Sequence, residues 1–109
     1  MNPAMLKKMH PEIELLLLRL REATQLLQAH QNIEWADWLM TDARMILQLD
    51  FYGIEHLLSA FGGMGSLNDV VLQRYDGNSL IVPSAENEQF SVLRQEIYSL
   101  ASKLKSEEF

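Results

Sequence analysis

The sequence predicts a small, mainly α-helical domain: four helices, with an irregular glycine-rich segment between the third and the fourth. Three observations predict this fold class. The length of 109 residues fits one domain. The hydrophobic fraction of 48% is ordinary for a globular protein. Long stretches near both ends repeat apolar residues with helical periodicity. We therefore expect residues 1–109 to form a single helical domain.

The first predicted helix runs from Pro11 to about Ala29. Pro11 suits a first helical turn, because the N–H that proline lacks would have no helical partner there. One face then repeats apolar residues at i, i+3, i+4 and i+7: Ile13, Leu16, Leu17, Leu20, Ala23 and Leu27. A second stripe of Leu15, Leu18 and Leu26 predicts that this helix packs between two neighbours.

Two further helices are predicted before the glycine-rich segment. Asn32 is a suitable N-cap for the second helix. Its expected core face is Ala36, Leu39, Met40, Ala43, Ile46 and Leu47. Asp50 is expected to cap a shorter third helix from about Phe51 to Phe61. Gly53 costs such a helix about 1 kcal/mol relative to Ala, so we expect a close packing contact at this position.

The segment after the third helix is predicted to be irregular. Gly62, Gly63 and Gly65 end the helix and indicate backbone at positive φ or under close approach. Residues 70–72 and 80–82 are strand-like and flank the turn signal at 76–78. Two structures fit this pattern: a small β-hairpin across the turn, or a short helical turn before an irregular loop.

The last predicted helix follows Pro83. Ser84 is expected to cap it, and Lys103 and Lys105 suit its C-terminal end. Its apolar residues keep near-heptad spacing: Phe90, Leu93, Ile97, Leu100, Ala101 and Leu104.

Composition excludes several kinds of chemistry. Without cysteine there is no disulfide, no thiolate metal site and no cysteine nucleophile. The three histidines lack the spacing of metal ligands, so we expect no metal. The glycine segment follows a helix and holds no lysine, unlike a phosphate-binding loop, and we expect no cofactor.

Charge and hydropathy set the expected surroundings of the protein. The apolar run 15–18 is flanked by charges and is too short to span a bilayer, and residues 1–10 lack the apolar stretch of a secretory signal. We therefore expect a cytoplasmic protein that does not enter a membrane. The net charge of −6 disfavours nucleic-acid binding, which needs clustered Lys and Arg.

The acidic middle of the chain contains the best surface candidates. Residues 31–80 hold two basic and seven acidic side chains, which suits a basic partner. Tryptophan is enriched at interface hot spots, whereas the spacing alone favours Trp35 and Trp38 as core residues. The expected partner-binding residues are Glu34, Trp35, Asp37, Trp38, Asp42 and Asp69.

Two sequence blocks resemble a known family. Residues 34–39 read E-W-A-D-W-L, and residues 53–69 read G-I-E-H-L-L-S-A-F-G-G-M-G-S-L-N-D. Both are similar to blocks of a small uncharacterised bacterial family. Small, acidic, cysteine-free bacterial proteins of this type resemble immunity proteins, which neutralise the toxins of interbacterial competition. The resemblance implies a binding protein rather than an enzyme, and it transfers no functional residue.

Three functions follow from this reading. The first is an immunity or antitoxin-type protein that occludes the active site or substrate entry of a cognate toxin with a basic surface. The second is a small hydrolase-like enzyme that uses His56 with Glu55 or Asp69. The third is a structural helical homodimer, joined through the stripe of Leu15, Leu18 and Leu26 or through the last helix. The sequence leaves the choice between monomer and homodimer open.

Overall fold

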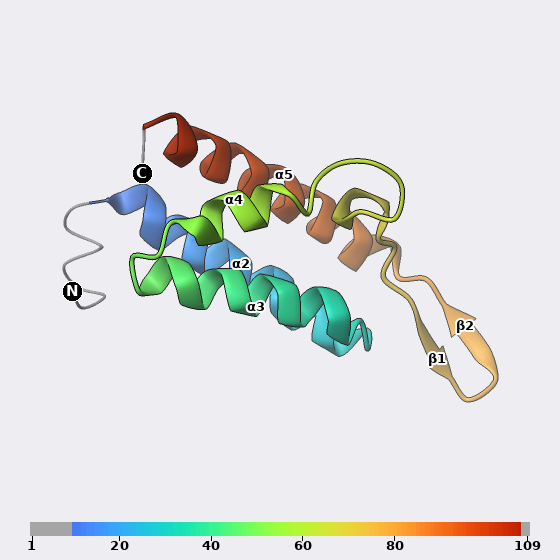
Figure 1. Cartoon of the computed structure of the whole chain (residues 1–109). Coiled ribbons are helices and arrows are strands. Elements are labelled where there is room, and N and C mark those ends of the chain that lie inside the picture. Colours follow the sequence, from blue (N-terminus) through green and yellow to red (C-terminus); the bar gives the residue numbers. More distant parts are fainter. Residues whose placement is uncertain (1–9, 108–109) are drawn as a thin grey trace.

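The computed structural model describes residues 10–107 and confirms the predicted fold class. Four helices are seen in this range, with a small antiparallel hairpin between the third and the fourth (Figure 1). What the sequence predicts for residues 1–9, 108 and 109 lies outside the described residues. The elements are α2 (Pro11–Ala29), α3 (Ile33–Leu47), α4 (Tyr52–Leu58), the 3-10 turn η1 (Leu67–Asp69), β1 (Arg74–Asp76), β2 (Ser79–Ile81) and α5 (Ser84–Ser106).

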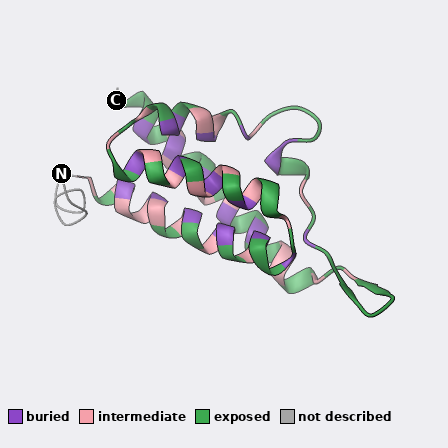
Figure 2. Cartoon of the chain, turned by 60° about the horizontal axis from the view of Figure 1, so that its bottom comes forward, coloured by how far each residue is buried: buried purple, intermediate pink, exposed green. Residues whose placement is uncertain are grey.

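Helix α2 is the central element, as its apolar pattern predicts. It packs against α3 on one side and α5 on another, while α4 packs on α3 and also contacts α5. Buried positions recur along the helices (Figure 2), and the largest buried side chains of α2 are fully buried: Ile13, Leu16, Leu20 and Leu27. None of the helices within residues 10–107 has the length and hydrophobicity needed to cross a membrane.

The second apolar stripe of α2 is divided between two surfaces. Leu15 lines a shallow hollow with α5, whereas Leu18 lines a groove with α3 and is 48% exposed. Leu26 is partly buried and packs against the core. The three leucines therefore do not form one continuous dimerisation face.

Most helix boundaries follow the predicted signals. Pro11 begins α2, and Asn32 Oδ1 accepts a hydrogen bond from the Trp35 N–H at the start of α3. The predicted cap of the third helix is wrong: α4 begins at Tyr52 and its N-cap is Phe51, which offers no side-chain cap. Asp50 precedes the cap, and its Oδ1 accepts a hydrogen bond from the Tyr52 N–H. The third helix is shorter than predicted and ends at Leu58, because the N–H groups of Ala60 and Phe61 bond three residues back and the backbone tightens.

The predicted cap of the last helix is wrong. Ser84 is the first residue of α5, and its N-cap is Pro83, which offers no side-chain cap. Asn87 makes the polar contacts here instead. Its Nδ2 donates to the carbonyl oxygens of Pro83 and Leu72, and its Oδ1 accepts from the Leu72 N–H.

The glycine segment has the backbone that its sequence predicts. Gly63 and Gly65 have φ values of +75° and +76°, which L side chains rarely adopt. The Gly65 N–H donates to Asp69 Oδ2 at 2.7 Å. The Arg94 guanidinium of α5 donates to three carbonyl oxygens of residues 67–70 and holds the segment against that helix.

Both structures considered for the next residues occur, one after the other. The short helical turn is η1, and the hairpin follows it. The first strand lies at Arg74–Asp76 rather than at 70–72, because the Asn87 side chain already occupies the N–H and the carbonyl of Leu72. The hairpin extends away from the helices, and nearly all of it is exposed (Figures 1 and 2).

Gly53 is required where α4 meets α3, as the sequence predicts. A Cβ at this position would lie 2.9 Å from Met45 Cβ and 3.0 Å from the Asp42 carbonyl oxygen. Neither atom is the end of a flexible side chain, so neither can easily move aside. The missing side chain therefore sets how closely the two helices approach.

Gly53→Ala is expected to lower the free energy of unfolding by up to about 2 kcal/mol. The overpacking cost, about 3 kcal/mol at the upper end, is offset in part by the gain of about 1 kcal/mol in helix propensity. Gly62→Ala is the matched control, since a Cβ there would have no atom within 4 Å. Thermal and urea unfolding measure both variants. Equal stability of the two would contradict the close approach at Gly53.

Candidate functional site

Four rings form a continuous row across α3 and α4, which we call the aromatic row. The Trp35 and Trp38 rings lie 5.2 Å apart between centroids. Trp38 stacks on His56 at 4.2 Å with an interplanar angle of 15°. Tyr52 follows at 6.2 Å from His56. The two tryptophans are thus part of a larger surface that neither helix makes alone.

The sequence builds this row from two local spacings and one contact between helices. Trp35 and Trp38 are three residues apart on α3, and Tyr52 and His56 are four apart on α4, so each pair shares a helical face. The close approach at Gly53 brings the two faces together. We infer that the row depends on the packing of α4 against α3.

The aromatic row has a buried edge and an exposed edge. Trp35 and Trp38 are both half-buried and pack against the core, so they are neither purely core nor purely surface. The Trp38 Nε1 atom is buried. Tyr52 is 57% exposed.

Asp42 lies beneath the row, and its predicted contact with a partner is wrong. Its side chain is fully buried, so it offers no surface to another protein. It follows Trp38 by one turn of α3, and its Oδ1 accepts a hydrogen bond from His56 Nδ1 at 2.5 Å. Asp42 therefore positions the imidazole from within the protein.

Burial raises the pKa of Asp42 to about 6, from its ordinary value of 3.8. The hydrogen bond and the charge of His56 oppose this rise, and the indole N–H of Trp38 lowers the pKa slightly more. Neither Trp38 Nε1 nor Asp42 Oδ2, however, makes a hydrogen bond of full geometry with any described group. One oxygen of a buried carboxylate is therefore incompletely satisfied.

The Asp42–His56 pair is the chemically distinctive feature of the site. A carboxylate on Nδ1 holds an imidazole in one orientation and leaves Nε2 as its second functional nitrogen. Of the candidate acids for His56, neither Glu55 nor Asp69 is its partner. Glu55 lines a hollow together with Lys105, and Asp69 closes the glycine segment.

The pair does not belong to a cluster of metal-binding side chains among the described residues. No three metal-binding side chains converge anywhere in residues 10–107. The nearby Ser59 hydroxyl donates to the carbonyl oxygen of His56. The arrangement is therefore best suited to fixing the ring of His56 within the aromatic row.

The remaining predicted residues divide into two places. Glu34 and Asp37 are exposed on α3, and neither makes an ion pair within the part of the chain that the structure describes. Asp69 is exposed in the glycine segment, where it bonds Gly65 and lies near Arg94. The structure thus places Glu34 and Asp37 on the same helix as the two tryptophans and gives Asp69 a separate environment.

Tyr52 and His56 are the site residues that the sequence reading did not include with the tryptophans. Their i, i+4 spacing on an expected helix was a usable signal. The spacing alone did not show that Tyr52 and His56 lie beside the tryptophans, because no local pattern specifies which face of α4 meets α3.

Comparison with known proteins places this site within a recognised sequence region. Residues 28–81 match the family model of a domain of unknown function, DUF6966. The matched region contains the whole aromatic row, Asp42 and the glycine segment, and it leaves out most of α2 and all of α5. Neither a curated protein nor a solved structure matches the chain.

The buried carboxylate makes a prediction about stability and pH. Between pH 3.8 and about 6, folded Asp42 binds more protons than it does in the unfolded chain. Its contribution to the unfolding free energy is therefore full below pH 3.8 and falls as the pH rises through about 6. We expect the stability of the wild type relative to Asp42→Asn to fall over this range, by at most about 3 kcal/mol.

Urea unfolding at a series of pH values checks this expectation. Asp37→Asn is the control, because it removes an exposed carboxylate from the same helix. A stability difference between wild type and Asp42→Asn that stays constant from pH 4 to about pH 7 would contradict a raised pKa of Asp42.

Proposed function

We propose that this chain is a protein-binding module of the immunity or antitoxin type, which holds a basic partner against the aromatic row. One observation carries the proposal: Trp35 and Trp38 form a contiguous, half-buried aromatic surface on α3, and the same helix exposes Glu34 and Asp37, which make no ion pair with any described residue.

The composition and rigidity of the row suit protein recognition. Tryptophan and tyrosine supply large contact areas and are over-represented among hot-spot residues. The Trp38 ring is fixed by stacking on His56, and His56 is fixed by Asp42. A preorganised surface loses little side-chain entropy when a partner binds.

The charges indicate the kind of partner. Glu34 and Asp37 are exposed on α3 and make no ion pair in the described residues. Such carboxylates accelerate encounter with a basic surface and suit arginine, whose guanidinium also stacks on tryptophan. A toxin that acts on nucleotides or nucleic acids carries basic groups around its active site. An acidic protein seated there would block substrate entry.

The enzyme alternative has one observation in its favour, the orientation of His56 by a buried carboxylate. It requires a substrate-binding hollow next to the ring. The groove of about 550 Å³ lies between α2 and α3 and does not include His56. We therefore place binding ahead of catalysis.

Identification of the partner is the first experiment. The tagged chain is used to capture proteins from the lysate of its source cells, and co-purifying proteins are identified by mass spectrometry. Each captured protein is then expressed alone and together with this chain. The expected result is one basic protein that stops growth alone and is neutralised by co-expression. Captured proteins that are all harmless when expressed alone would contradict the immunity role.

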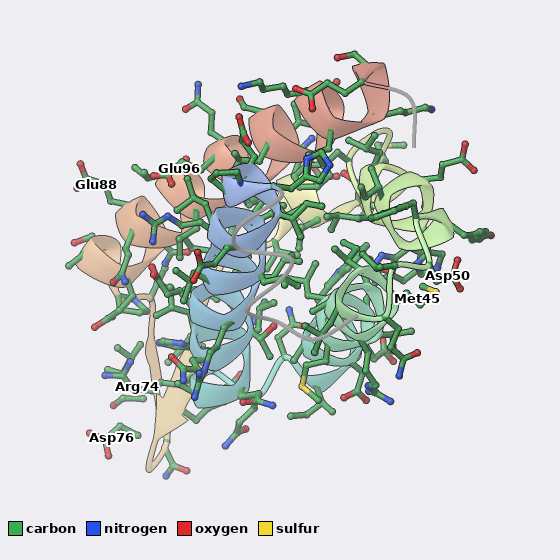
Figure 3. The ribbon with its side chains drawn as sticks, turned by 90° about the vertical axis from the view of Figure 1, so that its left-hand side faces the viewer. Met45, Asp50, Arg74, Asp76, Glu88 and Glu96 are labelled. Atoms are coloured by element: carbon green, nitrogen blue, oxygen red, sulfur yellow. The ribbon has the colours of Figure 1, made fainter. Side chains whose placement is uncertain are left out.

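Asp37→Lys is expected to weaken that complex at least about tenfold, because it places a cation where the partner presents cations. The control is Glu88→Lys on α5, which makes the same charge change at another exposed carboxylate. Figure 3 shows Glu88 on the side of the molecule away from Met45, near the C-terminal end of α3, and Asp50, which follows that helix. Calorimetric titration compares the two. Equal affinity of both variants would remove α3 from the interface.

A further inference from the structure

A groove of about 550 Å³ runs between α2 and α3, on a different side of α3 from the aromatic row. Its apolar lining includes Leu17, Leu18, Met40 and Leu47. Leu18 is 48% exposed and Leu47 is 38% exposed, so the groove leaves large apolar side chains in contact with water. This surface belongs to α2 and α3 alone, and the proposed partner-binding row does not use it.

Two arginines line the groove without an ion pair. Arg21 lies on α2 and Arg44 on α3, and neither has a carboxylate partner in the described residues. Among the described cations, Arg19 pairs with Glu22 and Glu96 and Lys103 pairs with Glu12. Arg74 and Arg94 instead contact the His30 ring and backbone carbonyl oxygens. Both guanidinium groups of the groove, on Arg21 and Arg44, are exposed, so this apolar groove has a basic margin in a protein of net charge −6, and an acidic group would complement it.

The exposed stripe of α2 carries the matching acid itself. Glu14, Leu17, Leu18 and Arg21 all line the groove and share one helical face. The stripe is self-complementary. If a second α2 lies antiparallel, with the two-fold axis between Leu17 and Leu18, Glu14 of each copy faces Arg21 of the other.

We propose that the groove is the interface of a symmetric homodimer, in which α2 of a second copy lies antiparallel along it. Leu18 of each copy enters the groove of the other, and two Glu14–Arg21 pairs flank the apolar centre. Such an isologous contact closes on itself. Arg44 adds a second cation close to the same interface.

The charges favour a second copy over other occupants. An anionic amphiphile or a purely acidic helix would match the arginines but would place Glu14 against like charge. A second α2 satisfies both signs at once. Glu14 already has an interaction within the monomer. A carboxylate has about four lone-pair sites, so it can accept a further guanidinium.

Sedimentation equilibrium of the full chain, from low to high micromolar concentration, tests the proposal. The wild type is expected to dimerise. Arg21→Glu and Glu14→Arg are each expected to raise the dimer dissociation constant by at least about tenfold, through like-charge repulsion. The combined variant restores the pairs with their charges exchanged and is expected to return close to the wild-type value.

Lys105→Glu is the control, because Lys105 is exposed on α5 and does not line the groove. It is expected to leave the dimer unchanged, and circular dichroism verifies that every variant is folded. A wild type that stays monomeric throughout would overturn the proposal. So would a dimer that tolerates both single reversals, or one that the combined variant fails to restore.

Discussion

The hydrogen bond between the buried Asp42 carboxylate and the His56 imidazole is the contact on which the rest of the site depends. It joins α3 to α4 beneath the surface and fixes the imidazole under Trp38. It spans the contact between the two helices at which Gly53 leaves no room for a Cβ. Gly53 and the buried Asp42 thus support the aromatic row, although neither residue is part of its surface.

Such an arrangement is costly to maintain. A buried carboxylate with one incompletely satisfied oxygen opposes folding, and the raised pKa of Asp42 expresses that cost. An asparagine or an apolar residue would avoid it. Sites that keep a costly polar group in this way are often sites where orientation matters more than stability. Here the oriented group is the ring that supports the row, which is consistent with a binding surface that must stay rigid.

The sequence was most informative where one face of one element decides the structure. The apolar repeat of α2 predicted its buried residues and its place between two neighbours, because helical periodicity depends only on the chain itself. Gly53 and the positive φ values of Gly63 and Gly65 were predictable for the same reason. The strand error and the cap error at α5 both involve Asn87, whose side chain takes the hydrogen bonds of Leu72 and Pro83.

The candidate site was less predictable, because it depends on contacts between elements. An acid such as Asp42 looks the same in a sequence whether it is exposed or buried. Its burial follows from the arrival of α4, fourteen residues further along the chain at His56. The two tryptophans were identifiable from residue type alone. Their ring partners were not, since no local signal shows which side of α4 faces α3.

The hairpin has a different relation to the fold. Asn87 holds the chain on both sides of it, at Leu72 before β1 and at Pro83 after β2. Arg74 adds a contact to His30 at its base, while the turn at Gly77 lies in solvent (Figure 1). Changes in the length or sequence of the hairpin turn are therefore not expected to alter the packing of the helices. This makes the turn a natural position for grafting a fluorescent label or a foreign peptide without disturbing either face of α3.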